Sequence, residues 1–80
     1  YSWLPNQIFV NQGDEVTLEI VGINGAEHNS SIENYVDYFV VRRGQITTLR
    51  FSADEPGVFR IFCTDHPESM IGELVVRART

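Results

Sequence analysis

The part of the sequence best suited to chemistry is the segment CTDHPESM at residues 63–70. It holds the only cysteine of the chain, Cys63, together with His66 and the only methionine, Met70, in C-x2-H-x3-M spacing. The other of the two histidines, His28, lies in a distant part of the sequence. A thiolate and a thioether are soft metal ligands and imidazole is intermediate, so this set of side chains is typical of a metal site.

The combination of donor atoms indicates which metal such a site would select. Two imidazoles and a thiolate, with a weak axial thioether, are the ligands of copper electron-transfer sites. Structural zinc sites prefer two or more cysteines, whereas calcium and magnesium require oxygen ligands. We therefore predict a copper site formed by His28, Cys63, His66 and Met70.

Each of these residues by itself has a simpler interpretation. A single cysteine on a strand is usually a small buried hydrophobe, and a methionine often fills a gap in a core. A metal site is favoured because every cysteine, histidine and methionine of the chain belongs to one ligand set. A Cys63–His66 nucleophile pair is disfavoured, since thiol proteases bring the two residues together from distant positions. No substrate pocket is indicated, so we expect no enzymatic activity from the chain itself.

These residues must be positioned by β-strands, because apolar and polar residues alternate along short segments and no helical period is sustained. The alternation places Phe59, Ile61 and Cys63 on one face of their strand. Strands separated by turns about every 8 to 12 residues are typical of a sandwich or small barrel. Loops distant in sequence meet at one end of a sandwich, so His28 can meet residues 63–70. The expected strands are residues 7–10, 15–20, 35–41, 45–52, 58–63 and 72–78, with a loop at residues 22–27.

Length and charge restrict the classes of function. Eighty residues make one small domain, which we expect over residues 1–80, and a domain of this size gains stability from a bound metal. The net charge is −5, no lysine is present, and the arginines form no basic stripe. This pattern argues against nucleic-acid binding and fits a basic protein partner. No apolar run reaches the roughly 18–20 residues of a membrane span, so membrane association would need a segment outside this sequence.

Three stretches of the sequence resemble the cupredoxins, a family of small copper-binding β-sandwiches. They are YSWLPNQIFVNQGDEVTLEI, FSADEPGVFRIFC and CTDHPESMIGELVV, and together they cover nearly the whole chain. The resemblance implies an all-β Greek-key sandwich that binds one copper ion. It also implies that His28 is the first histidine ligand, Cys63 the thiolate, His66 the second histidine and Met70 the axial ligand.

The resemblance further implies a pair of residues that support the ligands without binding the metal. Asn29 follows His28, and Thr64 follows Cys63. In blue copper members, an Asn and a Ser or Thr at these places form a hydrogen-bonded pair that ties the two ligand-bearing loops together. Such outer hydrogen bonds fix the orientation of ligands and tune the metal.

The stretch from His28 to Cys63 also resembles the branch that contains cytochrome c oxidase subunit II and nitrous oxide reductase. Domains of that branch hold a binuclear copper centre that needs two bridging cysteines. This chain has one cysteine, which favours a single copper ion. A carboxylate ligand, as in the red copper protein nitrosocyanin, is an alternative for which Glu27, Glu33 and Glu68 are candidates. By position, His28 rather than a glutamate takes the coordinating place.

The function implied by the resemblance is that of a type 1 copper protein that carries single electrons between redox partners. His66 would be the place where electrons enter and leave, and Asp37, Asp54 and Glu55 could steer a basic partner. Two alternatives stay open: a module for copper transfer or storage, and the electron-relay domain of a larger membrane-bound oxidase or reductase. Cupredoxins mostly work outside the cytoplasm, so the expected location is periplasmic or extracellular, with anchoring to the outer face of a membrane as one form of it.

Overall fold

The computed structural model of the chain describes residues 6–23, 27–64 and 71–79. These residues form strands and no helix, so none of the described part is a helix able to cross a membrane. The strands are β1 (Gln7–Asn11), β2 (Glu15–Val21), β3 (Glu27–Ile32), β4 (Val36–Arg42), β5 (Ile46–Ser52), β6 (Gly57–Cys63) and β7 (Ile71–Arg77).

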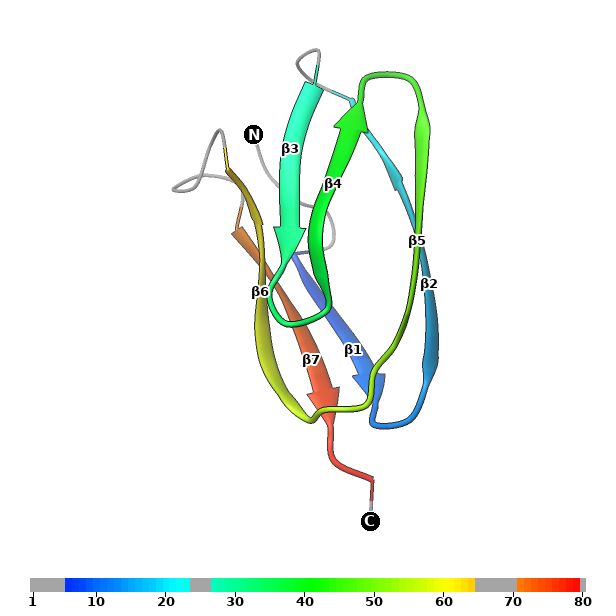
Figure 1. Cartoon of the computed structure of the whole chain (residues 1–80), viewed down its shortest axis with the longest axis vertical. Helices are drawn as coiled ribbons and strands as arrows, with labels where there is room; N and C mark the ends of the chain where they lie inside the picture. The colour runs from blue at the N-terminus through cyan, green and yellow to red at the C-terminus, as the bar shows by residue number, and fades with distance from the viewer. Residues whose placement is uncertain (1–5, 24–26, 65–70, 80) are drawn as a thin grey trace.

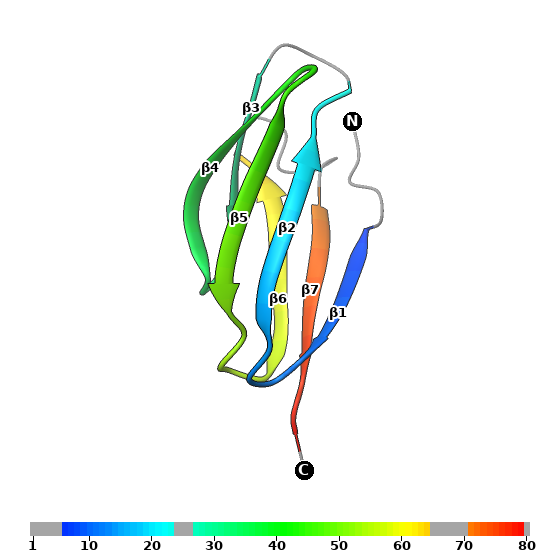
Figure 2. The ribbon, with the colours of Figure 1, turned by 90° about the vertical axis from the view of Figure 1, so that its right-hand side faces the viewer.

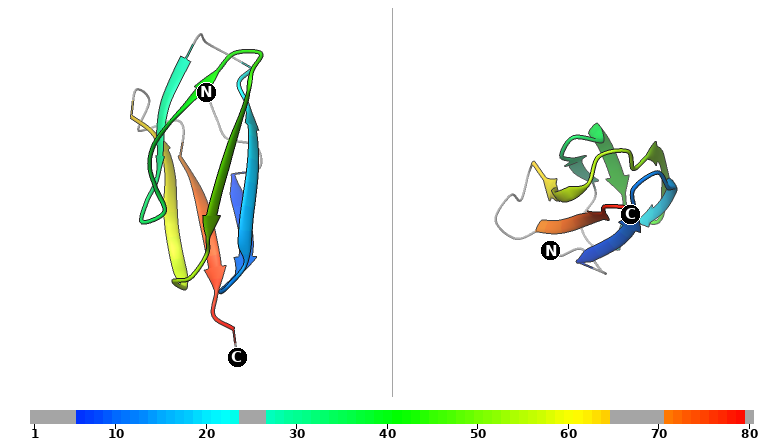
Figure 3. Two further views of the ribbon diagram at one scale, coloured as in Figure 1. Left: turned by 45° about the vertical axis from the view of Figure 1, so that its right-hand side comes forward. Right: turned by 90° about the horizontal axis from the view of Figure 1, so that it is seen from below.

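The strands are arranged in two sheets that face each other (Figures 1 and 2). The larger sheet has the order β1-β7-β6-β3-β4, and the smaller sheet pairs β2 with β5. The β3–β4 and β6–β7 neighbours are antiparallel, whereas β1 runs parallel to β7. The remaining connections cross between the sheets, and the strands curl around a common interior when viewed from one end (Figure 3). The predicted all-β Greek-key sandwich is confirmed.

The core lies between the sheets and is made by the alternating apolar residues that the sequence showed. In β6, Ile61 and Cys63 are buried while Arg60 is exposed, as the alternation predicted. Burial of one large aliphatic side chain stabilises the fold by about 1.5–3 kcal/mol. The buried apolar cluster consists of Val16, Ile32, Phe39, Val41, Leu49, Ala53, Ile61, Leu74 and Val76.

The strand β3 is the main departure from the sequence-based expectation, which placed no strand between the loop at residues 22–27 and residue 35. Its sequence, EHNSSI, has a single aliphatic residue, Ile32, and therefore lacks the apolar alternation of a typical strand. It is a strand because β4 and β6 flank it and supply partners for its backbone groups. His28 consequently lies near the start of a strand inside the larger sheet rather than in a loop.

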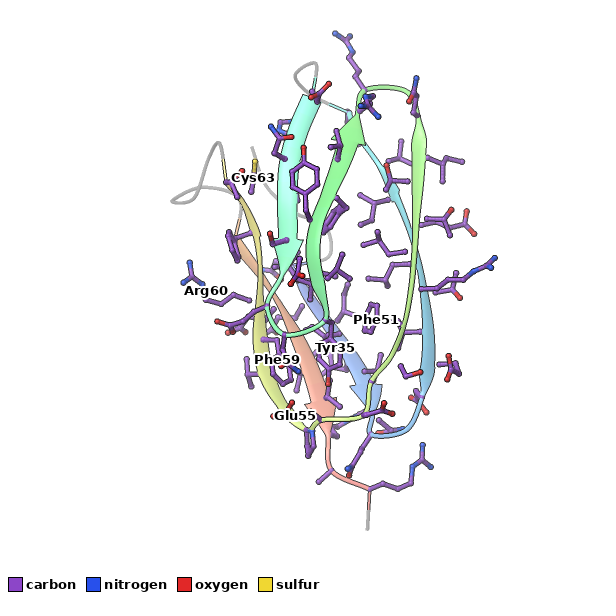
Figure 4. All side chains as sticks on the ribbon, viewed as in Figure 1. Tyr35, Phe51, Glu55, Phe59, Arg60 and Cys63 are labelled. Atoms are coloured by element: carbon purple, nitrogen blue, oxygen red, sulfur yellow. The ribbon has the colours of Figure 1, made fainter. Side chains whose placement is uncertain are left out.

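An aromatic cluster packs between the sheets toward the end of the sandwich that lies away from Cys63 (Figure 4). The ring of Tyr35 is 5.1 Å from Phe51 and 5.0 Å from Phe59, centroid to centroid. Its hydroxyl donates to the backbone oxygen of Glu55 and accepts from the Glu55 amide at 3.0 Å. Tyr35 thereby fastens the turn from which β6 starts, and β6 ends at Cys63.

Candidate metal centre

His28 and Cys63 lie on adjacent strands in the middle of the larger sheet. Ser30 on β3 is directly opposite Cys63 on β6, and His28 is two positions before Ser30. Residues two apart on a strand share a face, so His28 and Cys63 are diagonal neighbours, with Cα atoms roughly 7–8 Å apart by the usual geometry of such pairs. The structure thus brings together two predicted ligands that are far apart in sequence.

Both side chains face the interior. Cys63 is 0% exposed and His28 is 4% exposed, and the Nδ1 atom of the imidazole lies inside the protein. Between them, Ser30 is also fully buried and donates a long hydrogen bond of 3.5 Å to the His28 carbonyl oxygen. Water is therefore largely excluded from the side chains of these two predicted ligands.

The other two predicted ligands, His66 and Met70, lie outside the described residues, so their roles stay predictions. Within residues 6–23, 27–64 and 71–79, no group of three His, Cys, Asp or Glu side chains is placed to hold a metal ion. The described part of the centre is therefore the His28–Cys63 pair. A buried imidazole beside a buried thiol, both held by paired strands, fits a soft metal ion such as copper.

The structure also brings together the predicted supporting pair, Asn29 and Thr64. The Thr64 amide donates to the Asn29 backbone oxygen at 2.7 Å, and the Thr64 hydroxyl donates to the same oxygen at 3.1 Å. Asn29 thus contacts Thr64 through its backbone carbonyl, while its side-chain oxygen Oδ1 accepts a hydrogen bond from the Tyr38 hydroxyl. Tyr38 could not be identified from the sequence as a partner of Asn29, because an aromatic residue in a strand carries no signal for this contact.

Two of the three candidate carboxylate ligands point to other partners. The Glu27 carboxylate lies 3.5 Å from the Arg42 guanidinium on the exposed side of β3 and β4. Glu33 accepts a hydrogen bond from the Arg60 amide at 3.3 Å, and it follows the end of β3 opposite to His28. Strand geometry puts five residues at about 16 Å, too far for Glu33 to join the His28 site. Glu68 lies outside the described residues.

Two acidic residues that were predicted to steer a partner lie at one end of the sandwich. Asp54 and Glu55 lie in the turn between β5 and β6, and Figure 4 shows Glu55 at the opposite end of β6 from Cys63. Seven residues of extended strand separate the ends of β6, which corresponds to about 20 Å. Asp54 and Glu55 therefore lie far from the candidate centre, whereas the third residue predicted to steer a partner, Asp37, lies on β4.

Comparison with known proteins places the chain among cupredoxins. The family model described as "Cupredoxin-like domain" matches residues 2–76. A nitrous-oxide reductase from Ralstonia nicotianae is 36% identical in an alignment 66 residues long that covers 79% of this chain and 10% of the reductase. Cytochrome c oxidase subunit 2 from Thermus thermophilus is 28% identical in an alignment 81 residues long that covers 96% of this chain and 59% of that subunit. The chain thus spans about a tenth to about six tenths of the length of these relatives.

Solved structures agree on the fold. A heme-copper terminal oxidase chain superposes with a TM-score of 0.77 at 18% identity, covering 90% of this chain and 51% of that chain. Amicyanin in its reduced state superposes with a TM-score of 0.61 at 20% identity, covering 95% of this chain and 73% of that chain. The strand order and the family match agree with the resemblance noted from the sequence. The chain therefore belongs to the cupredoxin-like domain family.

Proposed function

We propose that this domain binds one copper ion in a mononuclear type 1 site and carries single electrons between redox partners. The observation that carries the proposal is the burial of His28 and Cys63 side by side on the inner face of β3 and β6. One imidazole and one thiolate make two of the three equatorial ligands of such a site. His66 and Met70 are proposed to complete the ligand set from the segment that follows Cys63.

The residues of the chain would contribute binding, rigidity and exclusion of water. Cys63 would bind as a thiolate, so its proton is released when the metal enters. His28 would bind as the neutral imidazole, and the pairing of β3 with β6 holds both side chains at a constant spacing. Copper bound there would supply a one-electron couple, Cu(II)/Cu(I). A scaffold that changes little between the two oxidation states lowers the rearrangement that accompanies electron transfer.

A single ion is proposed because the chain has one cysteine. A centre with two bridging thiolates needs a second cysteine, which the sequence does not contain. Within the described residues Cys63 is the one thiol, and no group of three His, Cys, Asp or Glu side chains is placed to hold a metal ion.

Copper loading with metal analysis and visible spectroscopy tests the proposal. The expected result is one copper per chain and an intense blue or green colour in the oxidised protein, which is lost on reduction. Cys63→Ser should remove the colour, because the charge-transfer transition needs the thiolate sulfur. A colourless oxidised wild-type protein, or two copper ions per chain, would contradict the proposal.

A second candidate function is that of the electron-relay domain within a larger oxidase or reductase. It is favoured by the lengths of the relatives, of which this chain covers only 10% and 59%. In that case the partner would be a neighbouring domain, and the domain would work on the periplasmic or outer face of a membrane. The sequence on both sides of residues 1–80 in the genome distinguishes a relay domain from a separate carrier.

Copper transfer or storage is the third function considered. A carrier of electrons should show a reversible one-electron potential with fast self-exchange, whereas a transfer module should release its copper quickly to a chelator. In all three cases we propose that the domain itself catalyses no reaction. We also propose redox proteins as its partners, a basic one being favoured by the net charge of −5.

A further inference from the structure

Tyr38 makes a hydrogen bond that its position does not require. It lies on β4 with 61% of its surface exposed, so its ring contributes little to the core. An exposed phenol hydroxyl is ordinarily satisfied by water. Here the hydroxyl of Tyr38 instead donates to the Oδ1 atom of Asn29 on the neighbouring strand β3, at 2.5 Å.

The pairing of β3 with β4 does not depend on this contact. Glu27, His28 and Asn29 pair in register with Arg42, Val41 and Val40, and the register shifts only further along, between Ser30 and Ile32. The effect of the Tyr38 hydroxyl is therefore to hold the side chain of Asn29 rather than to join the strands.

Asn29 connects Tyr38 to the strand that carries Cys63. Its backbone oxygen accepts hydrogen bonds from both the amide and the hydroxyl of Thr64, at 2.7 and 3.1 Å. Thr64 directly follows Cys63, and Asn29 directly follows His28. Tyr38, Asn29 and Thr64 thus form a continuous chain of hydrogen bonds across β4, β3 and the end of β6, next to both described ligands.

We propose that Tyr38 is a positioning residue for the copper centre. By holding the Asn29 side chain, its hydroxyl limits the rotation of the Asn29 peptide and keeps the carbonyl directed at Thr64. Thr64 in turn fixes the backbone that presents the Cys63 sulfur. The proposal rests on the copper-binding function proposed above, and it assigns to β4 a part in a centre whose ligands lie on other segments.

The first test compares Tyr38→Phe with the wild-type protein after copper loading. Loss of a hydrogen bond outside the ligands typically lowers metal affinity roughly 10–100-fold, and the lower end is expected here because Tyr38 acts through Asn29. Competition with a chelator measures the affinity, and the visible spectrum reports a shift of the thiolate-to-copper band. An unchanged affinity together with an unchanged spectrum overturns the proposal.

Tyr35→Phe is the matched control. Like Tyr38→Phe, this variant removes a phenol hydroxyl. The Tyr35 hydroxyl makes its two hydrogen bonds with Glu55, at the end of the sandwich away from Cys63. This variant should lower the stability of the metal-free protein and leave copper affinity and spectrum as in the wild type. Equal changes in the two variants would show that Tyr38 acts only through general stability, which also overturns the proposal.

Two further measurements separate the role of Tyr38 from copper binding as such. Asn29→Ala keeps the backbone carbonyl and removes Oδ1, so the Tyr38→Phe/Asn29→Ala double variant should be no weaker in copper affinity than Asn29→Ala alone. In the metal-free protein, Tyr38→Phe should accelerate hydrogen exchange at the Thr64 amide, whereas Tyr35→Phe should not. Additive losses of affinity, or unchanged exchange at Thr64, count against the proposal.

Copper binding by the wild-type protein separates a failure of the proposed function from a failure of the role proposed for Tyr38. If the wild type binds no copper, the proposed function is wrong and the role of Tyr38 falls with it. If the wild type binds copper with the expected colour and Tyr38→Phe behaves like the wild type, only the role of Tyr38 is refuted.

Discussion

At the scale of single residues, Cys63 carries the most chemistry because it combines complete burial with a thiol. It lies opposite Ser30 in the β3–β6 ladder, so its immediate neighbour on that strand is a small residue. A buried thiol by itself packs as a small hydrophobe. Its position diagonal to a buried imidazole is the reason to interpret Cys63 as a candidate metal ligand.

Copper should therefore stabilise the wild-type fold and should not stabilise Cys63→Ser. A ligand that binds only the native state at 100 times its Kd adds about 2.7 kcal/mol to the free energy of unfolding. Thermal or urea unfolding with and without copper measures this difference. Equal stabilisation of both proteins would mean that copper binds elsewhere on the chain.

At the scale of elements, the central position of β3 determines how the candidate centre is built. Its inward residues alternate along the strand as His28, Ser30 and Ile32, each of them buried. The two polar residues lie at the end of the strand nearer the candidate metal centre. The apolar Ile32 packs into the hydrophobic core at the other end. Ile32 is thus the main apolar residue holding in place a strand that is otherwise polar.

Ile32→Ala should accordingly be far more harmful than the same substitution at an exposed position of the sandwich. Ile32 is 1% exposed, and truncation of a buried isoleucine to alanine usually costs about 2–5 kcal/mol. Ile46→Ala on β5 is the control, since Ile46 is 63% exposed and should change stability by less than about 0.5 kcal/mol. Chemical denaturation compares the two, and similar losses would argue against β3 as a core strand.

At the scale of the whole molecule, the two ends of the sandwich carry different sets of residues. One end holds the His28–Cys63 pair, and the other is closed by the Tyr35 cluster and the acidic turn at Asp54 and Glu55. The ends of β6 are about 20 Å apart, whereas the Debye length at physiological salt is about 8 Å. Solvent ions therefore screen the negative charge of the acidic turn, so this charge has little effect on electron transfer at the candidate centre.

Neutralising that turn with Asp54→Asn and Glu55→Gln should change electron transfer only at low salt. Oxidation of the reduced copper protein by hexaammineruthenium(III), a cationic reagent, measures the effect by stopped-flow spectroscopy. At about 0.15 M ionic strength the rate should differ from the wild type by less than about two-fold, because screening removes the long-range attraction. A large decrease that persists at this salt concentration would show that cations react at the acidic turn.

The strands that bury one face could be predicted from sequence, and the strand that carries His28 could not. In β2 and β6 the core selects apolar residues at alternate positions, so the burial is visible as a period of two. The polar sequence of β3 shows no such apolar period, because His28 and Ser30 take two of its three buried positions. Pairing with β4 and β6 makes this polar segment a strand. The contact between Tyr38 and Asn29 was likewise invisible, since it depends on the register between two strands.

The sequence was sufficient to predict the candidate donor atoms and to recognise the family, because ligand chemistry depends on residue type and spacing. It also determined that at most one thiolate is present. The tertiary structure was needed to show that His28 lies beside Cys63, that Asn29 contacts Thr64 through its backbone, and that the acidic turn lies at the far end. These are properties of strand order and register, which arise from pairings between distant segments and are encoded in no single stretch of the chain.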